Sequence, residues 1–334
     1  MARARRSIAV IQGGPSSEAE VSRASAASVA AALVEAGHSP VRLELNGHLG
    51  ESLRTGGYEV AFPVAHGAVG EDGALQGLLE VLEIPYVGSN VLASALAMDK
   101  RLARRILALD GLPVAKGIAL ARGDERAASD GALRARSEVG ARLVVKPSSH
   151  GSAIGVGRFD ESADAASIAE AILAVWEIDD VALIEHFARG REVTCGVLHV
   201  GGAVVALPLT EIVSPQDAFY TYEARYAPGR SLHTCPAALP DAIAARVQRM
   251  AEAAHVALGC RDLSRADFIV GDDADAKAIT LLEVNTMPGF TATSLYPEAA
   301  HVSGMAFPEL CHALVSEAFS RGSQRRIAAR ALPR

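Results

Sequence analysis

Two apolar runs near the end of the chain each carry a pair of polar residues two positions apart. The runs, residues 265–270 and 279–285, have the alternation of half-buried strands. The acidic stretch at 272–275 predicts the turn of a hairpin between them. Side chains two apart on a strand share a face, so a paired hairpin would gather four polar side chains on one surface. These are Arg265, Asp267, Glu283 and Asn285.

Two carboxylates and an amide oxygen on one surface are suitable ligands for a hard divalent cation. Mg²⁺ is usually held by one or two carboxylates together with substrate phosphates. The hairpin therefore predicts a magnesium–nucleotide site beside Arg265, with Asp267, Glu283 and Asn285 as metal ligands. A surface cluster of salt bridges would have the same pattern. These four residues alone do not separate the two interpretations.

Composition narrows the classes of protein that the chain can represent. At 334 residues, two or three domains are expected. There is no run of eighteen apolar residues, so no membrane span is expected. A net charge of −7 argues against a nucleic-acid partner. The four cysteines contain no CxxC pair, so neither a disulfide framework nor a zinc site is indicated, and a cytoplasmic protein is expected.

The first hundred residues alternate between strand and helix patterns. The apolar run at 8–11 predicts a strand buried on both faces, and an Ala-rich helix follows at 22–36. Further strands are expected at 41–45, 59–64 and 86–87. This alternation predicts a parallel α/β domain, in which ligands bind at the carboxyl ends of the strands. Residues 13–18 and 66–67 lie at such ends.

Residues 146–157 follow a predicted strand and are rich in glycine and serine. Such a loop lets backbone N–H groups approach an anion, and Lys146 and Lys100 add positive charge. The chain has no GxxxxGK[ST] loop and no GxGxxG after its first strand, so this is not a Walker A loop, and a dinucleotide site is poorly supported. A flexible hairpin loop would explain the same composition without any ligand.

Two other segments have both a functional and a structural interpretation. The aromatic-rich loop at 219–226 predicts a lid, or a loop pinned by its own aromatic side chains. The turn at 285–291 leaves the predicted metal ligands directly, and its N–H groups would suit an oxyanion pocket. A simple Pro-Gly turn explains the same residues.

Taken in order, these segments resemble the D-alanine–D-alanine ligase family of the ATP-grasp superfamily. The matching stretches are 13–22, 66–73, 98–100, 146–157, 219–226, 265–267 and 285–291. The resemblance implies an α/β fold, α+β in part, of three domains. An N-terminal Rossmann-like parallel-sheet domain for substrate would span 1–97, a central ATP-grasp subdomain 98–190, and a C-terminal subdomain with the metal site 191–334. ATP would lie between the last two.

The resemblance also implies the reaction and its partners. Two D-alanine molecules would be joined to D-alanyl-D-alanine through an acyl phosphate, with release of ADP and phosphate, for peptidoglycan precursors. The cofactors would be ATP and two Mg²⁺ ions, with Mn²⁺ as a substitute. The enzyme would be a cytoplasmic homodimer with no nucleic-acid or membrane partner.

The same resemblance assigns roles to individual residues. The catalytic set would be Glu18, Ser152, Tyr226, Arg265 and Gly289. Substrate would also meet His66, Ser294 and Leu295. The nucleotide would be bound by Lys100, Lys146, Glu185, His186, Ala188, Glu192 and Arg225.

Three positions depart from the family pattern, and other functions compete. Thr221 stands where the family often has Asp, while Arg225 and His186 stand where it often has Lys. A relative that makes D-alanyl-D-lactate or D-alanyl-D-serine is the nearest rival, and Tyr226 speaks against the lactate product. An ATP-grasp ligase with different substrates and a catalytically silent nucleotide-binding protein also compete. Against the silent protein stand the intact Lys146, Arg265, Asp267, Glu283 and Asn285.

Overall fold

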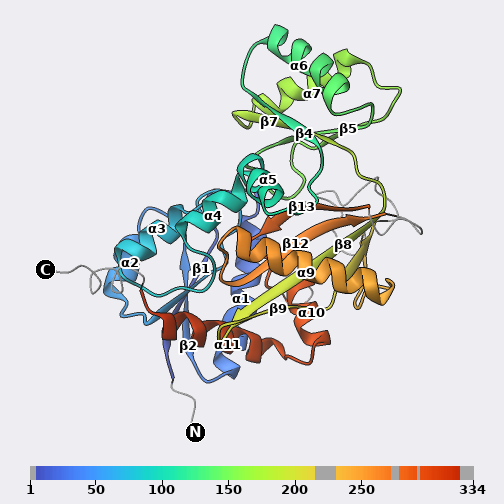
Figure 1. Cartoon of the computed structure of the whole chain (residues 1–334). Coiled ribbons are helices and arrows are strands. Elements are labelled where there is room, and N and C mark those ends of the chain that lie inside the picture. The colour runs from blue at the N-terminus through green and yellow to red at the C-terminus, as the bar shows by residue number, and fades with distance from the viewer. Residues whose placement is uncertain (1–4, 215–230, 272–277, 292–293, 324–334) are drawn as a thin grey trace, which may run out of the picture.

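Three sheets follow one another along the chain in the computed structural model (Figure 1). The structure describes residues 5–214, 231–271, 278–291 and 294–323. The sheet of residues 117–186 projects from the body of the molecule, together with its two helices. The other two sheets form the body, and the C-terminal helices lie against them.

The first sheet is parallel, as the strand–helix alternation predicts. Its order is β2-β1-β3, so the first strand lies in the middle. The strands are β1 (Ser7–Gln12), β2 (Ser39–Glu44) and β3 (Val60–Pro63). The helices between and after them are α1 (Ala19–Glu35), α2 (Leu49–Thr55) and α3 (Ala74–Val81).

Residues 8–11 of β1 are fully buried, and successive side chains enter different cores. Ile8 and Val10 pack with α1 and with the C-terminal helix α11 (Phe307–Arg321). Ala9 and Ile11 pack with α2 and α3 on the other face. Because both faces are covered, the strand is apolar at every position instead of every second one. This confirms the prediction of a strand buried on both sides.

The strand expected at residues 86–87 is shorter than predicted. Tyr86 forms a single parallel bridge with Ala61. In this bridge the N–H of Ala61 donates to the Pro85 carbonyl, and the N–H of Val87 donates to the Ala61 carbonyl. Pro85 has no N–H to extend the ladder, and Gly88 turns the chain away with φ of 100°. The local apolar pattern does not reveal this early exit.

Two helices connect the first sheet to the second. They are α4 (Val91–Met98) and α5 (Lys100–Leu109), with Asp99 between them. The Asp99 carboxylate accepts the N–H of Leu102 at 3.1 Å and so caps α5. Lys100 is therefore the first residue of α5, and its N–H donates to the Ser148 carbonyl at 2.9 Å.

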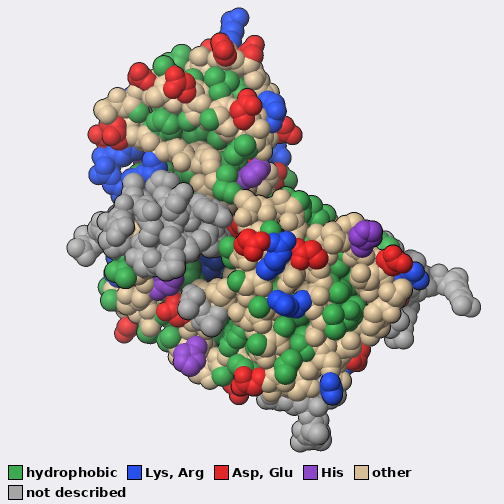
Figure 2. Space-filling model, turned by 180° about the vertical axis from the view of Figure 1, so that it is seen from behind, with side chains coloured by type: hydrophobic (Ala, Val, Ile, Leu, Met, Phe, Trp, Pro, Cys, Tyr) green, Lys and Arg blue, Asp and Glu red, His purple; other side chains and the backbone are tan. Residues whose placement is uncertain are grey.

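The second sheet is antiparallel, in the order β4-β7-β5-β6. Two helices, α6 (Glu125–Glu138) and α7 (Ala165–Trp176), cover one face of it (Figure 1). Charged side chains of both signs are scattered over the outer surface of this part (Figure 2). On α6, Arg134 and Glu138 form an exposed ion pair. The strands are β4 (Gly117–Ala121), β5 (Leu143–Pro147), β6 (Gly157–Phe159) and β7 (Val181–His186).

The third sheet contains the predicted hairpin. Its order is β11-β10-β8-β12-β13, with β9 paired to β8. The strands are β8 (Arg191–Val200), β9 (Ala203–Ala206), β10 (Thr210–Val213), β11 (Leu232–Thr234), β12 (Asp262–Val270) and β13 (Ile279–Asn285). The helices α9 (Asp241–Ala257) and α10 (Leu295–Val302) pack against this sheet. The turn expected at 272–275 lies outside the described residues.

The first and third sheets share one hydrophobic core. It joins side chains of β1, β3 and α1 to others from β8, β12, α10 and α11. A buried ion pair, Asp262 with Arg321, adds a polar link, because Arg321 also donates to the Tyr86 carbonyl at 2.9 Å.

The domain limits at 97/98 and 190/191 stay predictions. Among the described helices, none is long and apolar enough to cross a lipid bilayer.

Candidate active site

Two cavities lie where the three sheets meet. The larger, of about 500 Å³, is lined by residues from all three parts of the chain. The smaller, of about 150 Å³, lies between the second and third sheets. The two cavities share Lys100, Gly151 and Glu283. A molecule bound in one would therefore meet a molecule bound in the other at these residues.

Glu18 enters the larger cavity from the loop at the carboxyl end of β1. It occupies the N-cap position of α1 and is 8% exposed. Ser16, in the same loop, donates from its hydroxyl to the His66 carbonyl at 2.6 Å. The loops after β1 and β3 are thereby held together, because parallel strands end at the same edge of their sheet.

The glycine- and serine-rich loop after β5 reaches Glu18 from the second sheet. Ser152 donates from its hydroxyl to Oε1 of Glu18 at 2.5 Å. Ser152 and Ala153 both have left-handed backbone conformations, with φ of 53° and 56°. Such conformations are costly for residues with a side chain and persist where the surroundings hold them, often at functional sites.

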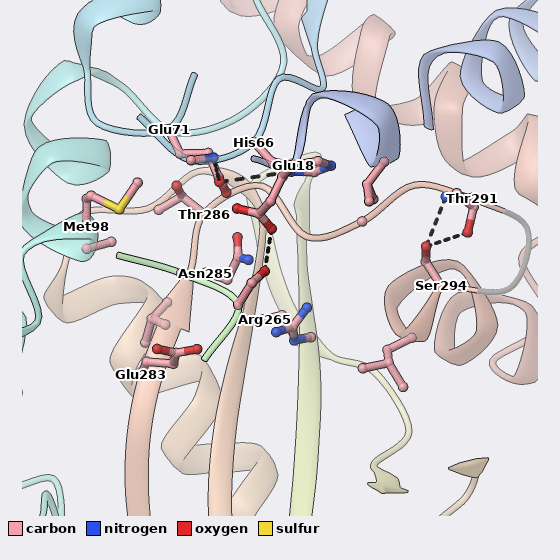
Figure 3. Close-up of a pocket in the computed structure, with 18 of the residues that line it drawn as sticks. Glu18, His66, Glu71, Met98, Arg265, Glu283, Asn285, Thr286, Thr291 and Ser294 are labelled. Atoms are coloured by element: carbon pink, nitrogen blue, oxygen red, sulfur yellow. Dashed lines mark hydrogen bonds and ion pairs between the residues drawn. The ribbon is translucent and has the colours of Figure 1, made fainter. Parts of the chain in front are cut away.

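Arg265 and two of the three predicted metal ligands, Glu283 and Asn285, line the larger cavity (Figure 3). The register pairs Arg265 with Asn285 and Asp267 with Glu283, so all four share a face, as the alternation predicted. Arg265 donates two hydrogen bonds of 2.8 Å to Asp267, whose Oδ1 also accepts from Thr194 at 2.6 Å. Asp267 lines neither cavity, and its role as a metal ligand stays a prediction.

Glu283 lies at the junction of the two cavities. Its carboxylate is 3.3 Å from Nζ of Lys100, which also donates to the His150 carbonyl at 2.6 Å. The side chain of Glu283 is 25% exposed, against 8% for that of Asp267. Asn285 accepts the N–H of Met287 at 2.8 Å and faces the larger cavity.

The smaller cavity is lined by all the residues predicted to bind the nucleotide except Arg225, which lies outside the described residues. Glu185 is 4% exposed, and its carboxylate forms ion pairs of 2.6 Å with both Lys146 and Arg104. Removing either cation would leave buried charge that is less well compensated, which is costly. The cavity is also lined by His186, Ala188 and Glu192.

The end of the larger cavity opposite the nucleotide side is formed by the turn after β13 and the start of α10. Gly289 lines it, and a Cβ at this position would lie 3.0 Å from the hydroxyl of Ser294. Ser294 is the N-cap of α10 and accepts the N–H of Thr291 at 3.0 Å. Leu295, the first residue of the helix, also faces the cavity.

Glu71 lines the larger cavity and lies in the matching stretch 66–73, but the sequence assigned no role to it. It lies beside Glu18 and His66 (Figure 3). Its carboxyl group is 4.0 Å from Nδ1 of His66 and accepts the N–H of Gly67 at 2.5 Å. Burial, followed by the nearby carboxylate of Glu18, raises the pKa of Glu71 to about 8. Burial also lowers the pKa of His66. The raised pKa of Glu71 favours its neutral form, and the lowered pKa of His66 favours the neutral imidazole.

The smaller cavity also contains a contact that no sequence signal identified. The guanidinium of Arg158 lies over the ring of Phe187, 3.9 Å from its centroid. The two residues come from β6 and from the end of β7, and only the sheet brings them together. An arginine stacked on an aromatic ring beside Glu192 would form one wall of a site for a flat, polar base.

The donor set fits a magnesium ion that is shared with a phosphate. Among the described residues, no three His, Cys, Asp or Glu side chains cluster closely enough to hold a metal by themselves. Glu283 and Asn285 nevertheless offer oxygen donors at the cavity floor, with Asp267 beside them. Mg²⁺ is commonly bound by one or two carboxylates, and phosphate oxygens and water complete its coordination.

The predicted lid, with Tyr226, Arg225 and Thr221, lies outside the described residues.

Comparison with known proteins places the chain in a family. Residues 106–316 match the family model described as D-ala D-ala ligase C-terminus, and residues 42–89 match D-ala D-ala ligase N-terminus. A D-alanine–D-alanine ligase of Desulforudis audaxviator is 44% identical over 318 residues, which cover 95% of this chain and 99% of that protein. One from Citrifermentans bemidjiense is 45% identical and covers 92% of this chain and 94% of that protein.

Solved structures agree with these matches. The D-alanine–D-alanine ligase of Bacillus anthracis complexed with ATP has a TM-score of 0.79 at 30% identity, over 95% of this chain and 98% of that one. The VanG D-Ala:D-Ser ligase of Enterococcus faecalis also has a TM-score of 0.79, at 27% identity, over 94% and 100%. The chain is therefore a ligase with the ATP-grasp fold and belongs to the D-alanine–D-alanine ligase family.

Proposed function

We propose that this protein joins two D-alanine molecules to D-alanyl-D-alanine, with ATP converted to ADP and phosphate. The observation that carries the proposal is the junction of the two cavities at Lys100, Gly151 and Glu283. A ligase must bring a carboxylate and a γ-phosphate into contact while keeping the rest of each molecule in its own site. Two cavities that meet at a lysine and a carboxylate fulfil that requirement.

In the first step, the carboxylate of the first D-alanine attacks the γ-phosphate, which breaks the bond between the γ-phosphorus and the bridging oxygen, releases ADP and forms an acyl phosphate. Glu18 would bind the ammonium group of this D-alanine, with His66 beside it. Lys100 and Lys146 would neutralise charge on the phosphates. The Arg158–Phe187 wall, with Glu185, His186 and Ala188, would hold the adenine, and Glu192 would hold the ribose.

A bound Mg²⁺ would supply neutralisation of phosphate charge in this site. Glu283 and Asn285 would hold it, with Asp267 as a further ligand, and the protein would use two such ions or Mn²⁺ in their place. Asp267 also orients Arg265 through two hydrogen bonds. One carboxylate would thus act on both the metal and the arginine.

In the second step, the amine of the second D-alanine attacks the acyl phosphate. Ser294 and the start of α10 at Leu295 would bind its carboxylate, since a helix N-terminus favours negative charge. Arg265 and the N–H of Gly289 would stabilise the oxyanion of the tetrahedral intermediate. Phosphate then leaves, and its departure completes the amide. The dipeptide would serve as a peptidoglycan precursor.

Phosphate release from ATP, measured with Mg²⁺ and one candidate substrate at a time, tests the proposal. We expect release with D-alanine and much less with D-serine, D-lactate or L-amino acids. D-serine matters as a competitor because the VanG D-Ala:D-Ser ligase has a similar structure. No release with D-alanine, but release with another amino acid, would disprove the substrate assignment. Mass spectrometry of the product would identify the dipeptide.

A further inference from the structure

A carboxylate outside both cavities holds the base of the glycine- and serine-rich loop. Asp179 lies between α7 and β7 and is 8% exposed. Its Oδ2 accepts the N–H of Ser149 at 2.8 Å and the Ser149 hydroxyl at 2.7 Å. Nδ1 of His150 lies 3.3 Å from the same oxygen, and Oδ1 accepts the N–H of Val181 at 3.0 Å. One carboxylate therefore joins the loop to the start of β7.

These hydrogen bonds favour the ionised form of Asp179. Burial acts to raise the pKa of the carboxyl, but the bonds donated by Ser149, Val181 and His150 outweigh it and hold the pKa below its usual value. The side chain is therefore charged at neutral pH. Hydrogen bonds to a charged acceptor are about twice as strong as those between neutral groups.

The residues that Asp179 holds lead directly to both cavities. The carbonyl of His150 accepts a hydrogen bond from Nζ of Lys100 at 2.6 Å, and Lys100 lies at the junction of the cavities. Two residues further along, Ser152 adopts its left-handed conformation and donates to Glu18. The backbone at residues 149–150 thus sets the position of two groups in the site.

The other end of the loop packs against the same connection. Gly155 lies so close to Ile178 that a Cβ there would be 2.9 Å from the Ile178 side chain. At the start of the loop, directly after β5, Ser148 donates from its hydroxyl to Asp99 at 2.8 Å, and its carbonyl accepts the N–H of Lys100 at 2.9 Å. The loop is therefore fixed at both ends, and Asp179 is the buried charge at its base.

We propose that Asp179 is a positioning residue for the ligase reaction. By holding Ser149 and His150, it fixes the carbonyl that orients Lys100 and the backbone that presents Ser152 to Glu18. This inference rests on the proposed function, because Lys100, Ser152 and Glu18 are the groups assigned there to phosphate and substrate. Asp179 lines neither cavity, so it acts through the loop and does not touch the reactants.

The neighbouring residue offers a matched control. The side chain of Asp180 is 90% exposed, against 6% for Asp179, and it pairs with Arg122 on the surface. The test compares Asp179→Ala and Asp179→Asn with Asp180→Ala and Asp180→Asn. Two measurements are made on each purified protein: calorimetric affinity for magnesium ADP, and steady-state kcat and KM for ATP. Circular dichroism and thermal melting report the folded fraction.

We expect Asp179→Ala to weaken ADP binding and to lower kcat, each by about tenfold, because small misplacements of reacting groups are costly. Asp179→Asn should weaken ADP binding and lower kcat less, because its amide oxygen can still accept from Ser149. Some loss is still expected, because its amide NH₂ group cannot accept the N–H of Val181. Both Asp180 variants should match the wild type. A residue with a purely structural role would lower the melting temperature without changing these constants.

Wild-type affinity and kcat in folded Asp179→Ala would overturn the inference. If Asp179→Ala does not fold, Asp179→Asn is the deciding variant. Unchanged ADP affinity and kcat in Asp179→Asn, together with a lowered melting temperature, would overturn the inference. A wild-type protein that binds ADP but releases no phosphate with D-alanine would refute the proposed function instead. The ADP affinities of the variants would still show whether Asp179 positions the loop.

Discussion

The hydroxyl of Ser152 donates a 2.5 Å hydrogen bond to Oε1 of Glu18, although 134 residues separate them in the chain. The bond joins the loop after β5 to the loop after β1, and both residues line the larger cavity. It also explains how a serine is held at φ of 53°. The conformation aims the hydroxyl at a carboxylate that is itself buried.

Replacing Ser152 separates the hydrogen bond from the backbone strain. A hydrogen bond to a charged group contributes roughly 1.5–3 kcal/mol, so Ser152→Ala should lower kcat/KM for D-alanine by about ten- to a hundredfold. Ser152→Gly loses the same bond but relieves the left-handed strain, which is on the order of 1 kcal/mol. We therefore expect Ser152→Gly to unfold at a higher urea concentration than Ser152→Ala. Equal kcat/KM for Ser152→Ala and the wild type would contradict the role assigned to this bond.

Glu283→Ala should abolish turnover without unfolding the protein. The side chain faces both cavities, so its loss removes a proposed metal ligand and the partner of Lys100 while the hydrophobic cores stay intact. We expect D-alanine-dependent phosphate release to fall by at least about a hundredfold, and circular dichroism to stay unchanged. Glu35→Ala, at an exposed position on α1, is the control. Near-normal activity in Glu283→Ala at low magnesium would rule out the metal role.

Glu71 should make stability fall as the pH rises from about 4.5 to about 8. Its pKa is about 8 in the folded protein against an ordinary value of 4.5, so over this range the folded state binds more protons than the unfolded state. Glu71→Gln cannot titrate, and its amide oxygen can still accept from Gly67. The free energy of unfolding of Glu71→Gln relative to the wild type should rise across this window by several kcal/mol, on the order of 4. Urea unfolding at pH 5 and pH 8.5 measures the difference, and a pH-independent difference would refute the raised pKa.

Arg321→Ala should destabilise the interface between the first and third sheets. Asp262 is 1% exposed, and its carboxylate accepts from Arg321 and from the N–H of Gly88. Removing one partner of a buried ion pair typically costs about 3–5 kcal/mol, because the other charge stays buried. The double variant Asp262→Asn/Arg321→Met should recover part of this loss. Urea unfolding of both, with the exposed Arg249→Ala as control, checks the expectation. A loss below about 0.5 kcal/mol in Arg321→Ala would contradict it.

The local parts of the fold and site followed from the sequence. The apolar run at 8–11 identified a strand buried on both faces, and the alternation in 265–270 and 279–285 identified the hairpin. Because the side chains of paired strands alternate with a period of two, the shared face of Arg265, Glu283 and Asn285 was also predictable. The strand expected at 86–87 was reduced to one bridge by Pro85 and Gly88.

The resemblance to a known family added residues that no local pattern could connect. Glu18 and Ser152 have no periodic relationship, and their contact depends on how two sheets pack. The raised pKa of Glu71 could not be predicted from the sequence, because it depends on burial and on the position of Glu18. Asp179 lies in an ordinary helix–strand connection and gains significance only because the loop folds back onto it.

The sequence by itself thus determined the strands, the hairpin and the face on which its polar residues lie, since these depend on neighbours a few positions away. Only the tertiary structure decided that Lys100 meets Glu283, that Ser152 meets Glu18 and that the two cavities join between them. Those contacts link segments more than a hundred residues apart. Their geometry is set by the packing of three sheets around shared cores, which a periodic pattern along one segment does not encode.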